Sequence, residues 1–327
     1  RLGDWHGGLR GWPKSLAVQT MDDAFTRIAG GTIYDPAGGA AREVRGLWMS
    51  GRKFVAAPTD PAVRPARTID ARGLAIMPGG VDVHCHIASG LAQAARTISP
   101  EQRRGAAAVV PRTQRTRSGT LGTVPSTFAT GYKYAALGYT TAFDAAVTPL
   151  GARHAHHELA DTPCLDAGLF VLVGDNRYAL QCIERGDGAQ LRMFLAWLLG
   201  ASRGYALKLV NPGGVAVWKG VAATRGHGLD DPVPGCSITP RQIVREIVAA
   251  ANDLQLPHPA HIHCNQLGMP GNWRTTLETM RAVEGRRAHF THIQFHSYGG
   301  GDEDEGSLSS RVAELAEYVN AHPNITV

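Results

Sequence analysis

The stretch Gly79-Gly80-Val81-Asp82-Val83-His84-Cys85-His86 decides the fold. It follows the apolar segment that ends at Met77-Pro78 and has the composition of a short buried strand. On a strand, residues i and i+2 point to the same face, so the imidazoles of His84 and His86 leave one strand end together. Two nitrogen ligands placed in this way can bind one metal ion. An isolated His-x-His pair is as readily a structural feature, so the rest of the chain has to supply further ligands.

Three later segments repeat the pattern of a short apolar run that ends in a polar group able to bind a metal ion. They are Tyr205–Val210 with Lys208, His261–Asn265 with His263, and Phe290–Gln294 with His292. Helical stretches separate them, and alternating strands and helices predict a parallel sheet covered by helices. Because barrel active sites lie at the C-terminal ends of the strands, we expect these groups to converge.

The periodicity from residue 79 onward predicts a (β/α)8 barrel that is interrupted before it closes, with six strand–helix units and the start of a seventh strand. Expected strands cover residues 81–86, 140–144, 169–174, 205–210, 260–264, 290–295 and the segment from 325 onward. Expected helices cover residues 127–137, 190–199, 239–254, 273–283 and 310–320. Thr239-Pro240-Arg241-Gln242 is a helix start, with Thr as N-cap, Pro at the first position and Gln three residues beyond the cap.

The N-terminal quarter has a different organisation. Residues 26–78 contain short strand-like runs separated by turns such as Asp35–Gly39, which predicts part of a small β-sandwich. Residues 1–25 lack periodicity, and Met21 resembles a natural start, so we expect a disordered or non-native extension there. At the other end, Val327 falls within an expected strand, and we expect the chain to be a fragment.

Composition narrows the class of protein. The formal charge of +5 comes from scattered basic residues, which argues against nucleic-acid binding. The arginine-rich stretch 103–117 is interpreted as a solvated loop, with binding of an acidic small molecule as the alternative. Five cysteines without a Cys-x-x-Cys pair indicate a reducing, cytoplasmic location. No apolar run reaches the length of a membrane span, so no membrane partner is expected.

Longer words of the sequence carry a family resemblance. They are Gly131–Ala146, Lys208–Gly214, Gly271–Met280 and Thr291–Gly299. With the His-x-His motif, they resemble the metal-dependent amidohydrolase superfamily. Within it they are similar to the A subunits of formylmethanofuran dehydrogenases and of the bacterial formyltransferase/hydrolase complexes. The resemblance runs from about Arg27 to Val327 and implies an amidohydrolase barrel.

The resemblance also implies a metal site. Its expected ligands are His84, His86, a carboxylated Lys208 that bridges two ions, His263 and His292. Two zinc ions are the expected cofactors, and other divalent metals remain possible. The aspartate of the last barrel strand, the family's general base, has no counterpart, since neither Asp144 nor Asp302 matches it. The catalytic proton carrier therefore stays unassigned, and we expect the chain alone to be inactive.

Several assignments have alternatives. Lys208 could instead bind a phosphate or carboxylate, and without the resemblance that interpretation is favoured. His261 shares a strand face with His263 and is interpreted as a hydrogen-bonded core histidine or a partner that orients a ligand. His296 is a candidate substrate contact, together with the loop residues Asn265, Asn272 and Tyr298.

The resemblance implies hydrolysis of N-formyl-methanofuran or N-formyl-methylofuran to formate and the free amine, or the reverse condensation. The chain would work as the A component of a multisubunit complex of one-carbon metabolism, with methanofuran or methylofuran as the substrate carrier. The alternatives are a cyclic amidase or deacylase of the hydantoinase or dihydroorotase kind, and a non-catalytic scaffold component. Metal stoichiometry separates enzyme from scaffold, because the enzyme should hold about two ions.

Overall fold

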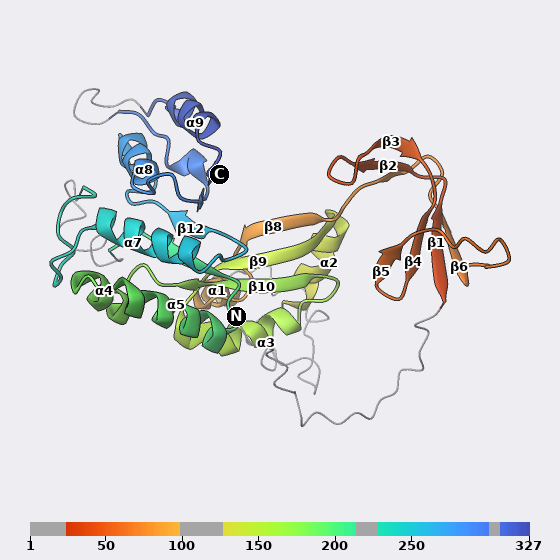
Figure 1. The fold of residues 1–327 in the computed structure, drawn as a ribbon, viewed down its shortest axis with the longest axis horizontal. Coiled ribbons are helices and arrows are strands. Elements are labelled where there is room, and N and C mark those ends of the chain that lie inside the picture. Colours follow the sequence, from red (N-terminus) through yellow and green to blue (C-terminus); the bar gives the residue numbers. More distant parts are fainter. Residues whose placement is uncertain (1–23, 99–126, 214–227, 301–307) are drawn as a thin grey trace. The chain divides into compact units, whose positions relative to one another are not determined.

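The computed structural model describes residues 24–98, 127–213, 228–300 and 308–327 (Figure 1). The expected N-terminal extension lies almost wholly outside these residues, as do Asp302 and the arginine-rich stretch. By its internal contacts the chain divides after Gly79 into two compact units.

The first unit consists of short strands in two sheets. One sheet has the order β5-β4-β1-β6 and the other the order β3-β2-β7. The strands are β1 (Phe25–Ala29), β2 (Thr32–Asp35), β3 (Ala40–Val44), β4 (Leu47–Ser50), β5 (Lys53–Val55), β6 (Arg67–Asp70) and β7 (Ala75–Ile76). The sequence did not predict β1 and β3, because their polar and apolar residues do not alternate cleanly.

The second unit is built on one sheet of seven strands in the order β14-β13-β12-β11-β10-β9-β8, and every pair is parallel. The strands are β8 (Gly80–Cys85), β9 (Tyr139–Val147), β10 (Asp166–Leu172), β11 (Ala206–Val210), β12 (Ala260–His263), β13 (Ala288–Phe290) and β14 (Ile325–Thr326). Neighbours in the sheet are neighbours in the sequence, which is the topology of a (β/α) barrel. The predicted fold class is confirmed, and all seven expected strands are present.

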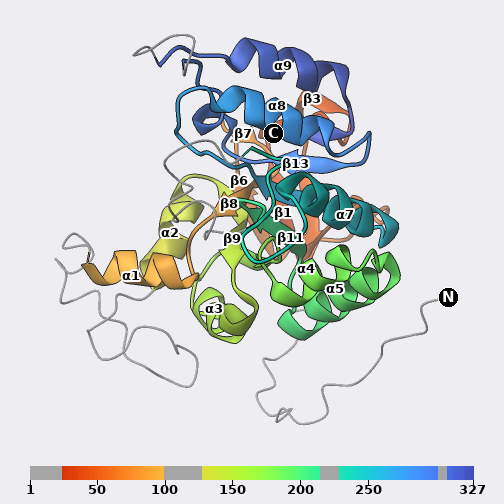
Figure 2. The ribbon, with the colours of Figure 1, turned by 90° about the vertical axis from the view of Figure 1, so that its left-hand side faces the viewer.

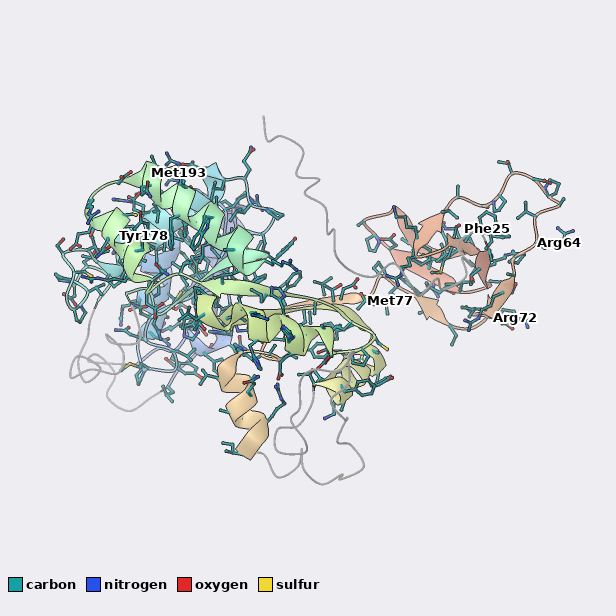
Figure 3. All side chains as sticks on the ribbon, turned by 90° about the horizontal axis from the view of Figure 1, so that it is seen from below. Phe25, Arg64, Arg72, Met77, Tyr178 and Met193 are labelled. Carbon is teal, nitrogen blue, oxygen red and sulfur yellow. The ribbon has the colours of Figure 1, made fainter. Side chains whose placement is uncertain are left out.

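Helices connect successive strands and cover the sheet. They are α1 (Gly90–Ile98), α2 (Phe128–Ala136), α3 (Ala152–Ala160), α4 (Arg177–Glu184), α5 (Gly188–Ser202), α7 (Pro240–Asp253), α8 (Asn272–Arg281) and α9 (Val312–Ala321). Helices α4, α5 and α7 lie side by side on one face (Figure 2). Tyr178 and Met193 lie on the exposed side of this layer (Figure 3). The capping box predicted at Thr239 is present, since its side chain accepts from the Gln242 N–H and the Gln242 side chain accepts from the Thr239 N–H.

Helices α1, α3 and α4 were not predicted. They are only eight or nine residues long, and α3 contains three histidines where the apolar stripe of a helix would be expected. Local polar contacts define α4, because the Asn176 side chain caps it by accepting from the N–H groups of Tyr178 and Ala179.

Strand β11 shows why the sheet can carry a polar site in its interior. Leu207 and Leu209 are fully buried in the main apolar core, which also contains Leu195 of α5 and Ile243 of α7. Because side chains alternate along a strand, Lys208 points to the opposite face from these leucines. The helix-covered face is therefore apolar, and the other face holds the polar groups.

The sixth barrel strand ends earlier than predicted. Strand β13 stops at Phe290, whereas the sequence was interpreted as a strand to Phe295. His292 has a φ of 40° in the left-handed region and begins a short 3₁₀ turn, η5, over Ile293–Phe295. The prediction that His292 and His296 share a face of one strand is therefore wrong, and the turn brings them together instead.

Candidate metal centre

The first histidine pair lies where β8 ends. His84 is the fifth residue of the strand, and its backbone N–H donates to Oδ1 of Asp82 at 2.9 Å. The rings of His84 and His86 are 5.2 Å apart and perpendicular. Nδ1 of His84 lies 2.8 Å from Nε2 of His261 and 2.7 Å from Oγ1 of Thr291. No described residue bonds the other nitrogen of the ring, Nε2.

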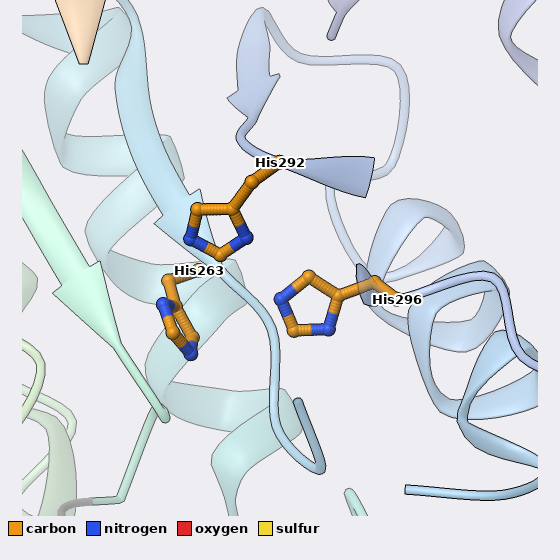
Figure 4. Close-up of side chains that lie close together, drawn as sticks. All are labelled: His263, His292 and His296. Atoms are coloured by element: carbon orange, nitrogen blue, oxygen red, sulfur yellow. The ribbon is translucent and has the colours of Figure 1, made fainter. Parts of the chain in front are cut away.

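His292 is the centre of the group. Its ring lies 5.0 Å from that of His84, 4.5 Å from that of His263 and 5.1 Å from that of His296. His263, His292 and His296 each offer a ring nitrogen within 4.8 Å of the others (Figure 4). The left-handed turn after β13 thus aims two imidazoles toward the end of β12.

Lys208 lies inside the barrel next to these histidines. It is only 1% exposed, and its Nζ has no hydrogen-bond partner. It stands opposite His261 in the register between β11 and β12. Desolvation lowers the pKa of the Lys208 ammonium from 10.5 to about 7. A buried amine without a partner is an unusual group, and it needs either a ligand or a chemical modification to offset its burial.

Burial keeps the imidazoles neutral. Desolvation, helped by the positive charge of Lys208, lowers the pKa of His84 to about 3 and that of His292 to about 4. Desolvation and the neighbouring His292 lower the pKa of His296 to about 3. For His263, desolvation and then His296 lower the pKa to about 2. A neutral imidazole has a free lone pair, which is the form that binds metal ions.

Several of these nitrogens have no partner. Nε2 of His263, Nδ1 of His292 and both ring nitrogens of His296 are buried without a hydrogen bond. An unsatisfied buried polar atom costs about 1–3 kcal/mol, so native proteins rarely retain several together without a ligand. A divalent cation offsets this cost, because imidazole nitrogens suit zinc. The group therefore fits a metal site on its own geometry.

Asp144 fixes the loop that follows the first pair. The carboxylate lies on β9 and is 0% exposed. Its Oδ2 accepts the backbone N–H groups of Ile87, Ala88 and Ser89 at 2.9, 2.6 and 2.9 Å. From the sequence, Asp144 was considered only as a general base, and this role was missed. A buried acidic residue late in a barrel strand was the available signal, but its partners could not be identified from the sequence.

The candidate substrate residues differ in what they offer. Asn265 is buried and donates to the Pro212 carbonyl at 3.3 Å, while its Oδ1 has no partner. Asn272 donates to the carbonyls of Gln266 and Phe295 and accepts from the Tyr298 N–H, so both of its N–H donors are used within the fold. Of these residues, Asn265 retains the capacity to accept a hydrogen bond from a ligand.

A second group of histidines lies below the first. His261 is 0% exposed and contacts the rings of His258 and His289 at 5.5 and 4.5 Å. The interpretation of His261 as a hydrogen-bonded core histidine is confirmed. His258 and His289 were interpreted as ordinary loop or helix-edge residues, and this is wrong for His289, which lies buried on β13. The register that pairs His261 with His289 brings them together.

A model of the amidohydrolase family matches residues 67–327. The match spans the sheet and every predicted ligand, so the chain belongs to the amidohydrolase family. It is 41% identical over 314 residues to protein FwdA of Methanocaldococcus jannaschii, covering 92% of this chain and 53% of that protein. It is 36% identical over 308 residues to the A component of the formyltransferase/hydrolase complex Fhc of Methylorubrum extorquens, covering 92% and 54%.

A solved structure agrees. The crystal structure of the formyltransferase/hydrolase complex FhcABCD from Methylorubrum extorquens with methylofuran matches with a TM-score of 0.79 at 35% identity, covering 92% of this chain and 53% of that one. The chain thus spans about half the length of the curated relatives that it matches. Within the described residues, no helix combines the length and apolarity needed to cross a membrane.

Proposed function

We propose that this chain carries the metal-binding part of an amidohydrolase that cleaves the C–N bond of an N-formyl amine. The observation behind this proposal is the convergence of buried, unpartnered nitrogens from His263, His292, His296 and Lys208. An enzyme that binds metal ions needs such a set, whereas a scaffold protein would gain nothing from burying it unsatisfied.

In this proposal the ligands are His84, His86, Lys208, His263 and His292, and they hold two zinc ions. When bound, such ions lower the pKa of a water molecule and polarise a carbonyl group. The contribution of the chain is to hold the imidazoles neutral and oriented. Asp144 does not carry the reaction's proton in this arrangement, because its Oδ2 already accepts three backbone N–H groups.

Lys208 is proposed to act as a carbamate. The neutral amine attacks carbon dioxide, an N–C bond forms, one C=O electron pair moves to oxygen, and an amine proton leaves to solvent. A lysine with the ordinary pKa is neutral in roughly one molecule in 3,000 at pH 7. With a pKa of about 7, about half of the Lys208 side chains are neutral at that pH. Burial therefore prepares this amine for carboxylation.

The substrate proposal rests on the relatives. We propose formyl-methanofuran or formyl-methylofuran, and other subunits of such a complex as partners, because the similar proteins carry these names. The chain offers complementary contacts for a formamide. A ring N–H of His296 can donate to the formyl oxygen, and Oδ1 of Asn265 can accept the amide N–H. We also propose a cytoplasmic location, since the five cysteines are free.

Metal content and formate release test the proposal together. In the intact protein with its partner subunits, we expect about two zinc ions per chain and formate release from the formylated carrier. Lys208→Met keeps the length of the side chain but cannot form a carbamate, and it should lose metal and activity. Lys133→Met, an exposed change on α2, is the matched control and should retain both. Unchanged metal content in the Lys208 variant would contradict the bridging role.

A further inference from the structure

Three imidazoles form a hydrogen-bonded string through the interior of the second unit, here called the histidine string: His84, His261 and His258. Nδ1 of His84 lies 2.8 Å from Nε2 of His261. Nδ1 of His261 lies 3.2 Å from Nε2 of His258. The string begins near the C-terminal end of β8 and reaches the N-terminal side of β12, since His258 precedes that strand.

Packing fixes the middle ring. His261 is fully buried, and the Phe170 ring lies 5.0 Å from it and 4.9 Å from the His258 ring. On its other side the ring of His289 lies 4.5 Å away. His261 therefore cannot turn away from His84 without opening the core, and its Nε2 is held toward the Nδ1 of His84.

The hydrogen bonds couple the tautomers of the three rings. A neutral imidazole carries one N–H, so it donates through one nitrogen and accepts through the other. If Nδ1–H of His84 donates to His261, then His261 must carry its own proton on Nδ1 and donate to Nε2 of His258. The opposite polarity would put the His84 proton on Nε2. That nitrogen has no bonding partner among the described residues, and it is the one available to a metal ion.

We propose that His261 is a positioning residue that fixes His84 in the tautomer with Nδ1–H, and so presents the unprotonated Nε2 of His84 to the metal. The hydroxyl of Thr291, 2.7 Å from the same Nδ1, shares this contact. Metal-binding histidines commonly donate their second N–H to a fixed acceptor, and loss of that acceptor typically weakens metal binding 10–100-fold. Here the acceptor is a buried imidazole, itself fixed by His258. The inference rests on the proposed metal site.

The test compares three variants of the intact protein by competition between the metal-free protein and a chelator for Zn²⁺. His261→Leu removes the acceptor at similar volume, and we expect zinc affinity to fall roughly 10–100-fold. His261→Gln retains an amide oxygen that reaches about as far as Nε2, so it should restore most of the affinity. His289→Leu is the matched control, because its ring packs on His261 but its Nδ1 pairs with Oγ1 of Thr326 instead of with His84.

A purely structural role of His261 predicts a different pattern. His261→Leu and His289→Leu would then weaken zinc binding equally, and Gln would not rescue, which would overturn the proposal. The ¹⁵N shifts of the zinc-loaded protein give a second readout: Nδ1 of both His84 and His261 should be protonated, and a protonated Nε2 on His261 would also overturn it. If the wild-type protein bound no zinc, the proposed function would fall with the inference; if it bound zinc and only the variant pattern failed, the inference alone would fall.

Discussion

Replacing Asp144 with Asn should destabilise the protein and loosen the loop after the first histidine pair. The carboxylate is 0% exposed, and its Oδ2 accepts three consecutive backbone N–H groups at 2.9, 2.6 and 2.9 Å. Those groups belong to residues 87–89, which directly follow His86. Asn is nearly isosteric, so the change removes the charge and leaves the volume of the side chain in place.

The magnitude follows from the kind of bond that is lost. A hydrogen bond to a charged group contributes about 1.5–3 kcal/mol, and a neutral one about 0.5–1.5 kcal/mol. Three bonds that each weaken by about 1 kcal/mol give a loss of about 3 kcal/mol in the free energy of unfolding. In addition, the amide NH₂ would face the Ala146 N–H, which now points at Oδ1 from 3.4 Å. Asp144→Ala leaves all three N–H groups unsatisfied and should cost more.

The assay is thermal unfolding of the metal-free protein, so that zinc binding does not mask the difference. A loss of about 3 kcal/mol corresponds to a fall in Tm of roughly 5–10 °C. Asp166→Asn, the same chemical change at an exposed position on the neighbouring β10, should alter stability by less than about 0.5 kcal/mol. If Asp144→Asn melted within about 2 °C of that control, the three bonds would not carry the stability assigned to them.

Three further changes test separate features. Gly131→Ala should destabilise α2 because the new Cβ would collide with the Pro163 carbonyl, whereas Gly200→Ala meets no atom within 4 Å and should stabilise α5 by up to about 1 kcal/mol in urea unfolding. Thr239→Ala should cost about 1 kcal/mol in the same assay, because it removes the capping box of α7. Stability of the metal-free protein should rise from about pH 7 to about pH 10.5, because the pKa of Lys208 is lowered in the folded state and the unfolded chain binds the extra proton there; Lys208→Met should abolish that rise.

The strand order and most ligand positions could be predicted because they depend on local patterns. An apolar run that ends in a histidine marks a strand end, and parallel strands bring their ends together. His84, His263 and His292 converge for this reason, with ring separations of 4.5 and 5.0 Å along the row. The capping box at Thr239 was predictable for the same reason, since all of its groups lie within four residues.

What could not be predicted depends on register and on backbone conformations that the sequence does not announce. The contact between His84 and His261 joins residues 177 positions apart, and it requires the rings to meet across the interior. The left-handed conformation of His292 is strained for a residue with a side chain, and no glycine marked it. The helix α3 carries its apolar contacts through alanines and Leu159, which gives a weak pattern.

The charges around the site lead to one more prediction. The charges that shift the pKa values of His84, His263, His292 and His296 come, within the described part of the chain, from Lys208 and from other histidines. Two divalent ions bring four positive charges into this buried group, and neutral imidazoles do not compensate them. A carbamate on Lys208 converts a neutral or cationic amine into an anion at the point where it is needed.

Metal binding should therefore depend on carbon dioxide. We expect metal-free protein to take up zinc weakly in CO₂-free buffer and to take it up about tenfold more tightly or better after bicarbonate is added, since one buried charge pair contributes more than the 1.4 kcal/mol that a factor of ten requires. Lys208→Met should bind weakly under both conditions. Equal zinc affinity of the wild-type protein with and without bicarbonate would mean that another anion balances the site, and that the neutral lysine of the metal-free protein is not the precursor of a ligand.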